Sequence, residues 1–331
     1  MRIIGHRGAS GYRPEHTAQA YRLAFSLGAD AVEPDLVASR DGVLVIRHEN
    51  ELSGTTDVAQ HPEFETRRTT KTIDGARVSG WFTEDFTWDE LCTLRARERR
   101  PEIRPENAVF DDRFPLLCLP QLFTLVDELN AEHGGHDGIV AELKHPAYFE
   151  SIGLPLAELY ARDVANAGWS ARGDQLATET VDVDVLREVR ERGVPGPLVL
   201  LFEEDESGDG AGPDAAARQM GLNALRGQVD AISVHKSVLL ASGDGTTVSD
   251  RSGGTAGIAC AAPLVVAAHD AGLQVYCWTL RPENRYLSER YRRGADPARF
   301  GAWREEWRQI ASLGADAVFA DHPDLARSVL R

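Results

Sequence analysis

The sequence lacks the features that mark membrane-spanning, secreted and nucleic-acid-binding proteins. No apolar run approaches the ~20 residues needed to cross a bilayer, and the first predicted strand starts directly after Met1 and Arg2, leaving no room for a signal peptide. Lysine and arginine number 36 against 52 acidic residues, a formal charge of −16, which argues against nucleic acid and anionic lipid as partners. We therefore expect a cytoplasmic protein without a stable membrane anchor and without a nucleic-acid partner.

Cysteine is equally sparse. The four cysteines, Cys92, Cys118, Cys260 and Cys277, lie far apart and form neither a Cys-x-x-Cys pair nor a zinc-ligand spacing. We expect buried free thiols rather than a disulfide framework or a zinc site. A glycine-rich Gly-x-Gly-x-x-Gly turn after a strand is also missing, which argues against an open doubly wound sheet, the main alternative architecture.

What the sequence does contain is a steady alternation of short apolar runs and amphipathic stretches. Eight strand-like runs with intervening helices predict an α/β fold, a (β/α)8 TIM barrel. The predicted strands are 3–4, 31–35, 139–143, 175–178, 197–202, 231–234, 274–278 and 317–319. The predicted helices are 18–27 (with Thr17 as its cap and Gly28 as its stop), 120–133, 149–167, 183–192, 214–225, 259–271 and 303–313.

Between residues 50 and 116 the alternation breaks down, and ~65 residues is too long for an ordinary barrel loop. We therefore predict an insertion subdomain at 50–116 after the second strand, in a barrel domain formed by 1–49 and 117–331. The four aromatics Trp81, Phe82, Phe86 and Trp88 are expected to form the insertion's small core. Residues 203–213 and 253–254 are interpreted as flexible loops and not as phosphate cradles.

The candidate chemistry gathers at the ends of the first apolar runs. His6 follows the first run, Glu33 and Asp35 close the second, and His48 follows the run 43–46. Residues i and i+2 of an extended segment share a face, so the two carboxylates can converge on one point. Hard oxygen ligands favour Mg²⁺ or Ca²⁺ over zinc. Two histidines beside such a site are suited to be a general acid and a general base. Pro34 is interpreted as the point where strand pairing ends.

Taken together and in this order, these fragments resemble a known family, the glycerophosphodiester phosphodiesterases. The resemblance runs over nearly the whole chain, and the long version of the insertion resembles that of the periplasmic-type enzymes. The matching elements are Gly5-His6-Arg7-Gly8, Pro14-Glu15-His16-Thr17, Glu33-Pro34-Asp35, His48-Glu49, Glu142-Leu143-Lys144, 275–279 and 319–324.

The resemblance implies a site and a reaction. Glu33, Asp35 and Glu142 would bind the cation, Ca²⁺ or Mg²⁺, with Ca²⁺ favoured by the long insertion. His6 and His48 would be the acid and the base, in an order that the sequence leaves open. The substrate would be a small glycerophosphodiester, hydrolysed to glycerol 3-phosphate and an alcohol, through a cyclic phosphate or by direct attack of water.

Other residues would support this chemistry. Arg7 and Lys144 would bind the phosphoryl oxygens and offset charge in the transition state. Glu15 would orient or supplement the site. Trp278 would wall the glycerol pocket or pack in the core. His235 and Lys236 end another strand and are expected to face the same mouth.

Three positions depart from the family pattern. His16 replaces the usual asparagine, Glu49 the usual aspartate and Asn50 a frequent proline, which puts substrate choice and rate in question more than the fold. Two alternative functions therefore stay open: a lysophospholipase D or sphingomyelinase D-like lipid phosphodiesterase, and a non-catalytic phosphodiester-binding protein. The oligomeric state and the head-group preference are not encoded in any pattern that we find.

Overall fold

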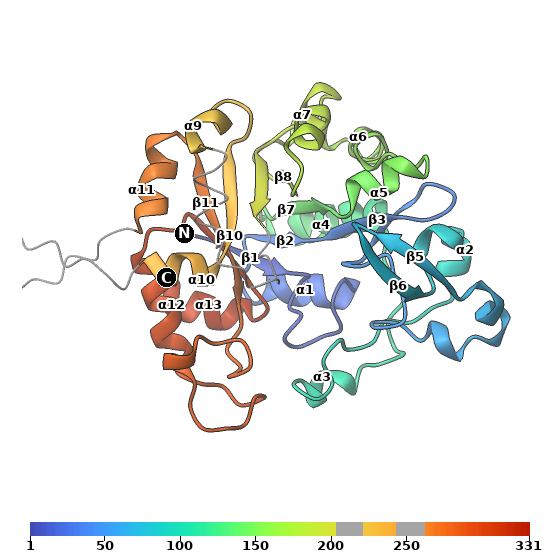
Figure 1. Cartoon of the computed structure of the whole chain (residues 1–331), viewed down its shortest axis with the longest axis horizontal. Helices are drawn as coiled ribbons and strands as arrows, with labels where there is room; N and C mark the ends of the chain where they lie inside the picture. The colour runs from blue at the N-terminus through green and yellow to red at the C-terminus, as the bar shows by residue number, and fades with distance from the viewer. Residues whose placement is uncertain (203–220, 243–261) are drawn as a thin grey trace, which may run out of the picture.

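A barrel of parallel strands organises the computed structural model, which describes residues 1–202, 221–242 and 262–331. Its eight strands pair in the order given below, and the ring closes where β12 pairs with β1. The TIM barrel predicted from the sequence is confirmed (Figure 1). The strands are β1 (Arg2–His6), β2 (Ala31–Glu33), β7 (Gly138–Leu143), β8 (Leu176–Thr180), β9 (Leu198–Phe202), β10 (Ala231–His235), β11 (Gln274–Leu280) and β12 (Ala317–Ala320).

Helices pack around the strands, as a TIM barrel requires. They are α1 (Ala18–Ser26), α4 (Leu119–His133), α5 (Pro146–Ser151), α6 (Leu156–Asn166), α7 (Val183–Glu191), α9 (Leu222–Leu225), α10 (Lys236–Ser242), α11 (Pro263–Asp270), α12 (Trp303–Ser312) and α13 (Pro323–Leu330). Two short 3-10 turns, η4 (Trp169–Ala171) and η5 (Glu289–Tyr291), lie among them.

Most predicted helices are confirmed, with two qualifications. Thr17 caps α1 by accepting the Ala20 N–H at 3.1 Å, as expected. The single helix predicted over 149–167 is wrong: α5 and α6 are separate, because Gly153 adopts φ +78° and Pro155 follows it. The predicted loops 203–213 and 253–254, and most of the helix predicted over 214–225, lie outside the described residues.

The barrel interior is small and filled by side chains of alternate strand positions. Ile3 points outward into the large core between strands and helices, whereas Ile4 points inward. This alternation leaves the carboxyl ends of the strands free for polar residues. The inward apolar cluster consists of Ile4, Ala31, Val140, Ala177, Val199, Ala231, Tyr276, Ala317 and Phe319.

The second strand is interrupted at Pro34 and then continues. β2 pairs with β1 on one side and with β7 on the other. After Pro34, β3 (Asp35–Ala38) keeps β7 as a neighbour but exchanges β1 for the antiparallel strand β4 (Leu44–Ile46). The expectation that strand pairing ends at Pro34 is therefore wrong. The proline removes one donor, while its carbonyl still accepts the Glu142 N–H at 2.9 Å.

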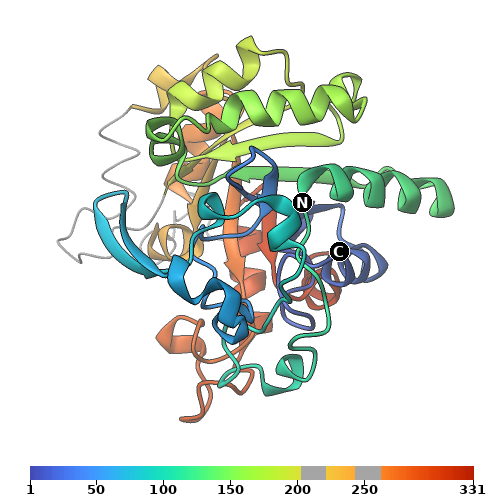
Figure 2. The ribbon, with the colours of Figure 1, turned by 90° about the vertical axis from the view of Figure 1, so that its right-hand side faces the viewer.

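Residues 50–116 connect β4 to α4 through short elements that lie over the barrel (Figure 2). These are η1 (Val58–Gln60), η2 (Pro62–Arg67), β5 (Thr69–Ile73), β6 (Ala76–Gly80), η3 (Thr83–Asp85), α2 (Trp88–Leu91) and α3 (Pro105–Ala108). Trp81, Phe82 and Phe86 are buried, and Trp88 is partly buried. Trp81 and Phe86 belong to the same continuous core as the barrel helices, so the segment does not pack around a small core of its own. The division into barrel and insertion stays a prediction.

The structure describes three of the four cysteines. Cys92, Cys118 and Cys277 are free, and the last two are buried. Cys260 lies outside the described residues. Among the helices of the described ranges, none has both the length and the apolar character to cross a membrane.

Candidate active site

A cavity of about 180 Å³ opens at the carboxyl ends of the barrel strands. Most predicted site residues line it, and Asp35 and Glu15 lie directly behind the lining, where they contact Arg7. The structure thus brings together residues that are up to about 270 positions apart in the sequence. The lining residues are His6, Arg7, Glu33, His48, Glu142, Lys144, Glu179, Leu201, Trp278, Thr279, Arg281 and Phe319.

Three carboxylates meet at one side of this cavity. Glu33, Asp35 and Glu142 each offer an oxygen within 4.8 Å of the other two, and all three side chains are buried. Strand register explains the convergence, because Asp35 lies opposite Glu142 across the β3–β7 ladder. Burial and the neighbouring charge of Asp35 raise the pKa of Glu33 well above its ordinary value. Burial also raises the pKa of Glu142, although Lys144 opposes the shift.

Asp35 is the carboxylate with the most contacts in this group. One oxygen, Oδ2, lies 2.8 Å from His16 Nε2 and 3.2 Å from Arg7 Nε. Burial alone would raise the pKa of Asp35, but the charges of Lys144 and its other neighbours hold it well below the ordinary range. The other oxygen, Oδ1, is buried without a hydrogen-bond partner and has the Lys144 ammonium 3.6 Å away.

This donor set fits a hard divalent cation. The three residues offer only oxygen ligands, which Mg²⁺ and Ca²⁺ prefer. Asp35 Oδ1 is a buried acceptor with no hydrogen-bond donor of its own, and a cation would satisfy it. A cation would also relieve the mutual repulsion that disfavours ionised Glu33 and Glu142.

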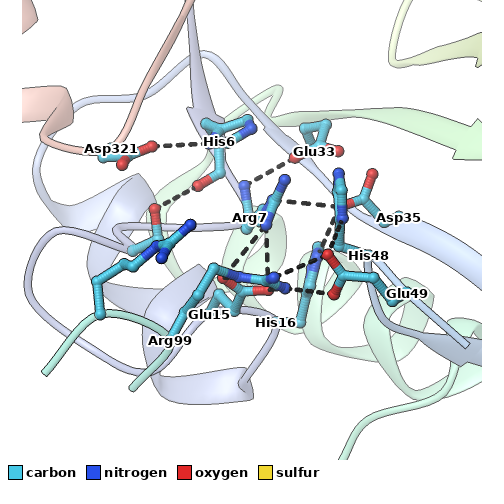
Figure 3. A network of polar contacts seen from close by, with 12 residues as sticks. His6, Arg7, Glu15, His16, Glu33, Asp35, His48, Glu49, Arg99 and Asp321 are labelled. Atoms are coloured by element: carbon cyan, nitrogen blue, oxygen red, sulfur yellow. Dashed lines mark hydrogen bonds and ion pairs between the residues drawn. The ribbon is translucent and has the colours of Figure 1, made fainter. Parts of the chain in front are cut away.

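Each histidine is held through its Nδ1 atom by a carboxylate. His6 Nδ1 lies 2.7 Å from Asp321 Oδ1, and His48 Nδ1 lies 2.6 Å from Glu49 Oε1 (Figure 3). If Nδ1 carries the proton in both rings, Nε2 is the nitrogen left for substrate. Burial lowers the pKa of His6 to about 4, against the opposing charge of Asp321.

A tight turn after β1 places the first histidine and the arginine beside it. Arg7 and Gly8 adopt φ +57° and +88°, and the Arg7 N–H donates to Glu33 Oε2 at 2.8 Å. A Cβ on Gly8 would lie 2.7 Å from the Ala20 carbonyl carbon, so only glycine fits against α1. The Arg7 guanidinium donates to both oxygens of Glu15, at 3.2 and 3.3 Å.

Lys144 and Trp278 also line the cavity. Lys144 Nζ donates to Glu142 Oε1 at 2.5 Å. The ring of Trp278 meets His235 edge-on at 4.9 Å between centroids. Trp278 Nε1 is buried and has no hydrogen-bond partner among the residues that the structure describes. The expectation that Lys236 faces the same mouth is wrong, because its ammonium donates to Glu306 of α12 at 2.7 Å.

The three departures from the family pattern have visible contacts. His16, at φ +59°, bridges Tyr21 and Asp35 with its two ring nitrogens. Asn50 is buried and donates to both oxygens of Glu84, at 3.1 and 3.2 Å. Glu49 contacts His48, as described above. His16 thus reaches a proposed metal ligand, whereas Asn50 makes a contact within the segment 50–116.

Several residues of this site were not assigned a role from the sequence. Asp321 and Arg281 directly follow β12 and β11, so the rule that found Glu142 could have found them. Glu179 lies opposite Glu142 in the β7–β8 ladder, and burial raises the pKa of Glu179 to about 7. Arg99 and Arg104 come from the segment 50–116, where no periodicity points to them.

Comparisons with known proteins identify the family. The family model described as the glycerophosphoryl diester phosphodiesterase family matches residues 6–325. The chain belongs to this family. The resemblance found in the sequence is confirmed, while the assignment to the long-insertion branch stays a prediction.

Relatives in the family cover the chain to different extents. A glycerophosphodiester phosphodiesterase from Treponema pallidum is 27% identical over 340 residues, covering 98% of this chain and 90% of that protein. One from Haemophilus influenzae is 32% identical over 201 residues, covering 58% and 53%. One from Arabidopsis thaliana is 39% identical over 145 residues, covering 44% and 37%. The matched part thus spans about half or less of the last two proteins.

Solved structures of the family share the fold. A glycerophosphodiester phosphodiesterase from Agrobacterium tumefaciens superposes with a TM-score of 0.58 at 18% identity, covering 99% of this chain and all of that one. A phosphodiesterase from Oleispira antarctica, in complex with the product sn-glycerol-3-phosphate, superposes with a TM-score of 0.59 at 17% identity, covering 100% and 96%.

Proposed function

We propose that this chain hydrolyses small glycerophosphodiesters to glycerol 3-phosphate and an alcohol, in a metal-dependent reaction with His6 and His48 as acid and base. The observation that carries the proposal is one cavity lined by both histidines, by Glu33 and Glu142 and by Arg7 and Lys144, with Asp35 directly behind the two glutamates. Membership of the family supports it.

Glu33, Asp35 and Glu142 would hold the cation, Ca²⁺ or Mg²⁺. When bound, the cation supplies Lewis-acid chemistry, offsetting the negative charge of the phosphate. Lys144 and Arg7 line the cavity beside these carboxylates, and their charged groups bind phosphoryl oxygens and stabilise the charge that builds up in the transition state. Trp278 provides an apolar wall for the glycerol carbons.

Proton transfer is the task of the two histidines. One accepts the proton of the attacking hydroxyl, which is the glycerol hydroxyl in a cyclic-phosphate route or water in a direct route. The other donates a proton to the leaving alkoxide. Asp321 and Glu49 keep Nδ1 of each ring occupied, so that Nε2 is the nitrogen that exchanges protons with the substrate.

Soluble diesters suit the site better than lipids. A lipid phosphodiesterase would present an exposed apolar rim near the cavity, whereas Trp81, Phe82 and Phe86 of the segment 50–116 are buried. The non-catalytic alternative rests on the three motif departures. Two of them keep polar contacts inside the site, at His16 and Glu49, and none removes a proposed ligand or histidine.

The test is release of glycerol 3-phosphate from a panel of soluble glycerophosphodiesters, after chelation and again with Ca²⁺ or Mg²⁺ restored. His6→Ala and His48→Ala should each lower kcat by about 10²–10⁴-fold. His136→Ala is the matched control, since this histidine is exposed and pairs only with Asp174 on the surface. Failure to hydrolyse any soluble diester with either metal would refute the proposal, and turnover of lysolipids alone would favour the lipid enzyme.

Cation binding has a readout that does not need activity. Metal added to chelated protein should raise the thermal midpoint, because a ligand that binds only the folded state stabilises it by about 2.7 kcal/mol at 100 times its Kd. Asp35→Asn should abolish the rise. An equal rise in Asp35→Asn and the wild type would place the cation elsewhere.

A further inference from the structure

Each histidine of the site ends a short chain of contacts that leads into the segment 50–116. In the first chain of contacts, Glu49 accepts a hydrogen bond from His48 Nδ1 and two from Arg99. Arg99 Nη1 and Nη2 donate to Glu49 Oε1 and Oε2, both at 2.7 Å (Figure 3). Arg99 also donates to both oxygens of Glu15, at 2.6 and 2.8 Å. One guanidinium thus fixes two carboxylates of the site at once.

The second chain of contacts repeats this arrangement with different elements. Asp321 contacts His6 through Oδ1, and its Oδ2 accepts from Arg104 Nη2 at 2.6 Å and from Arg281 Nε at 2.8 Å. Arg104 in turn donates from Nε to Glu283 at 2.7 Å. Arg104 and Asp321 are both largely buried, so this contact is shielded from solvent.

The two arginines act at a distance from the cavity. Neither lines it, so each reaches the cavity through carboxylates. Arg104 does so through Asp321 to His6, and Arg99 through Glu49 to His48 and through Glu15 to Arg7. A carboxylate that holds a histidine ring fixes the tautomer and the direction of Nε2 only as well as it is itself held. Arg99 holds Glu49 with the planar guanidinium fork, whose two parallel donors keep a carboxylate in one plane. Arg104 gives Asp321 one donor and Glu283 another, so it ties these two carboxylates together.

We propose that Arg99 and Arg104 are positioning residues for His48 and His6, so that the segment 50–116 sets the geometry of both proton-transfer groups. This inference rests on the proposed function. It gives the segment a role in the reaction that its position outside the cavity does not suggest. The two arginines are five residues apart, so one short stretch of chain controls the acid and the base together.

A purely structural role is the competing explanation. In that case the arginines would only dock the segment on the barrel, and their loss would lower stability without changing how the reaction depends on its leaving group. Arg100 offers a matched control, because it lies between them in the sequence and its side chain is exposed.

The experiment compares Arg99→Ala, Arg104→Ala and Arg100→Ala on two substrates at a temperature well below all thermal midpoints. The first, glycerophosphocholine, has an alkoxide leaving group that needs a proton. The second, the p-nitrophenyl diester of glycerol 3-phosphate, has a leaving group that departs without one. The general acid therefore matters only for the first substrate, whereas the general base matters for both.

We expect Arg99→Ala and Arg104→Ala to lower kcat for glycerophosphocholine by about 10- to 100-fold, the usual effect of removing an outer partner of a site residue, with KM changed by less than about threefold. On the nitrophenyl substrate, one of the two variants should regain most of its kcat. That variant identifies the histidine that acts as the acid. Millimolar guanidinium should restore part of the lost kcat in both, and none in Arg100→Ala.

The inference is overturned if Arg99→Ala and Arg104→Ala both keep the kcat of Arg100→Ala. It is also overturned if, in each of the two variants, kcat falls by the same factor for glycerophosphocholine and for the nitrophenyl substrate. If either alanine variant fails to fold, Arg99→Lys and Arg104→Lys replace them, since lysine keeps the charge and loses the fork. Wild-type turnover tests the proposed function separately. Active wild type with variants equal to the control would refute the positioning role alone.

Discussion

Lys236 tests whether a buried residue next to the candidate site contributes to the reaction or only to stability. It directly follows β10 at the catalytic end of the barrel, yet its ammonium donates to Glu306 at 2.7 Å, away from the cavity. The two side chains are 4% and 0% exposed, and the other Glu306 oxygen accepts the Ser288 N–H at 2.8 Å. Lys236→Met removes the ammonium and leaves the carboxylate buried with one donor.

The expected loss of stability follows from that burial. Breaking a buried ion pair by removing one partner costs about 3–5 kcal/mol, because an uncompensated charge remains inside. For a chain of this size, where ~1 kcal/mol corresponds to about 2 °C, the thermal midpoint should fall by about 6–10 °C. Lys236→Met/Glu306→Gln should recover at least half of this loss, since the amide keeps an acceptor for Ser288 and carries no charge.

The assay pairs thermal unfolding, followed by circular dichroism, with turnover of glycerophosphocholine at 25 °C. Lys236 does not line the cavity, so kcat should stay within about twofold of wild type. A large loss of kcat with an unchanged midpoint would refute the reasoning and would return Lys236 to the site.

Three further predictions concern pH, substrate binding and backbone strain. Burial raises the pKa of Glu98 to about 7 from 4.5, so the folded chain holds an extra proton between these values and loses stability as the pH rises through that window. Glu98→Gln should lack this pH-dependent loss of stability, so the thermal midpoint of the variant should rise relative to that of the wild type between pH 5 and pH 8. Parallel plots of the two midpoints against pH would contradict the raised pKa. Trp278→Ala should raise KM for glycerophosphocholine about tenfold, from the loss of roughly 1–2 kcal/mol of apolar contact, with a smaller effect on kcat; an unchanged KM would assign the ring to core packing. Gly8→Ala should cost about 1–3 kcal/mol of unfolding free energy, because a Cβ would meet the backbone of Ala20 at 2.7 Å. Gly75→Ala is its control, with a similar φ of +84° but nothing within 4 Å, and it should lose less; equal losses would mean that the contact with α1 is not limiting.

Much of the barrel could be predicted because its strands are short apolar runs, buried on both faces and separated by amphipathic helices. Successive side chains of a strand point to opposite faces, which gives a period of two. That period also places the carboxylates. Ala31 points into the barrel, so Glu33 does as well. The same rule, applied from Ala231, points residue 233 inward, but β10 ends at His235 and Lys236 begins α10, so strand alternation does not determine the direction of Lys236.

Other features could not be predicted because no local pattern encodes them. Arg99 and Arg104 lie in a segment without helical or strand periodicity, and their partners Glu49 and Asp321 are 50 and 217 positions away. Only the folded chain places them together. The break between α5 and α6 does have a local cause, in Gly153 and Pro155, but the apolar positions on both sides continue at helical spacing and hide it.

The interruption of the second strand at Pro34 affects the directions from which His6 and His48 approach the site. Up to Glu33, the edge of the second strand opposite β7 pairs with β1, which runs parallel to it and ends in His6. Beyond Pro34 the same edge is occupied by β4, which runs antiparallel and leads into His48. The two histidines therefore approach the proline along one edge from opposite ends. Displacement at phosphorus places the entering and leaving oxygens on opposite sides of the atom. A strand that changes its partner at a single residue would bring one of the two proposed proton-transfer histidines to each side.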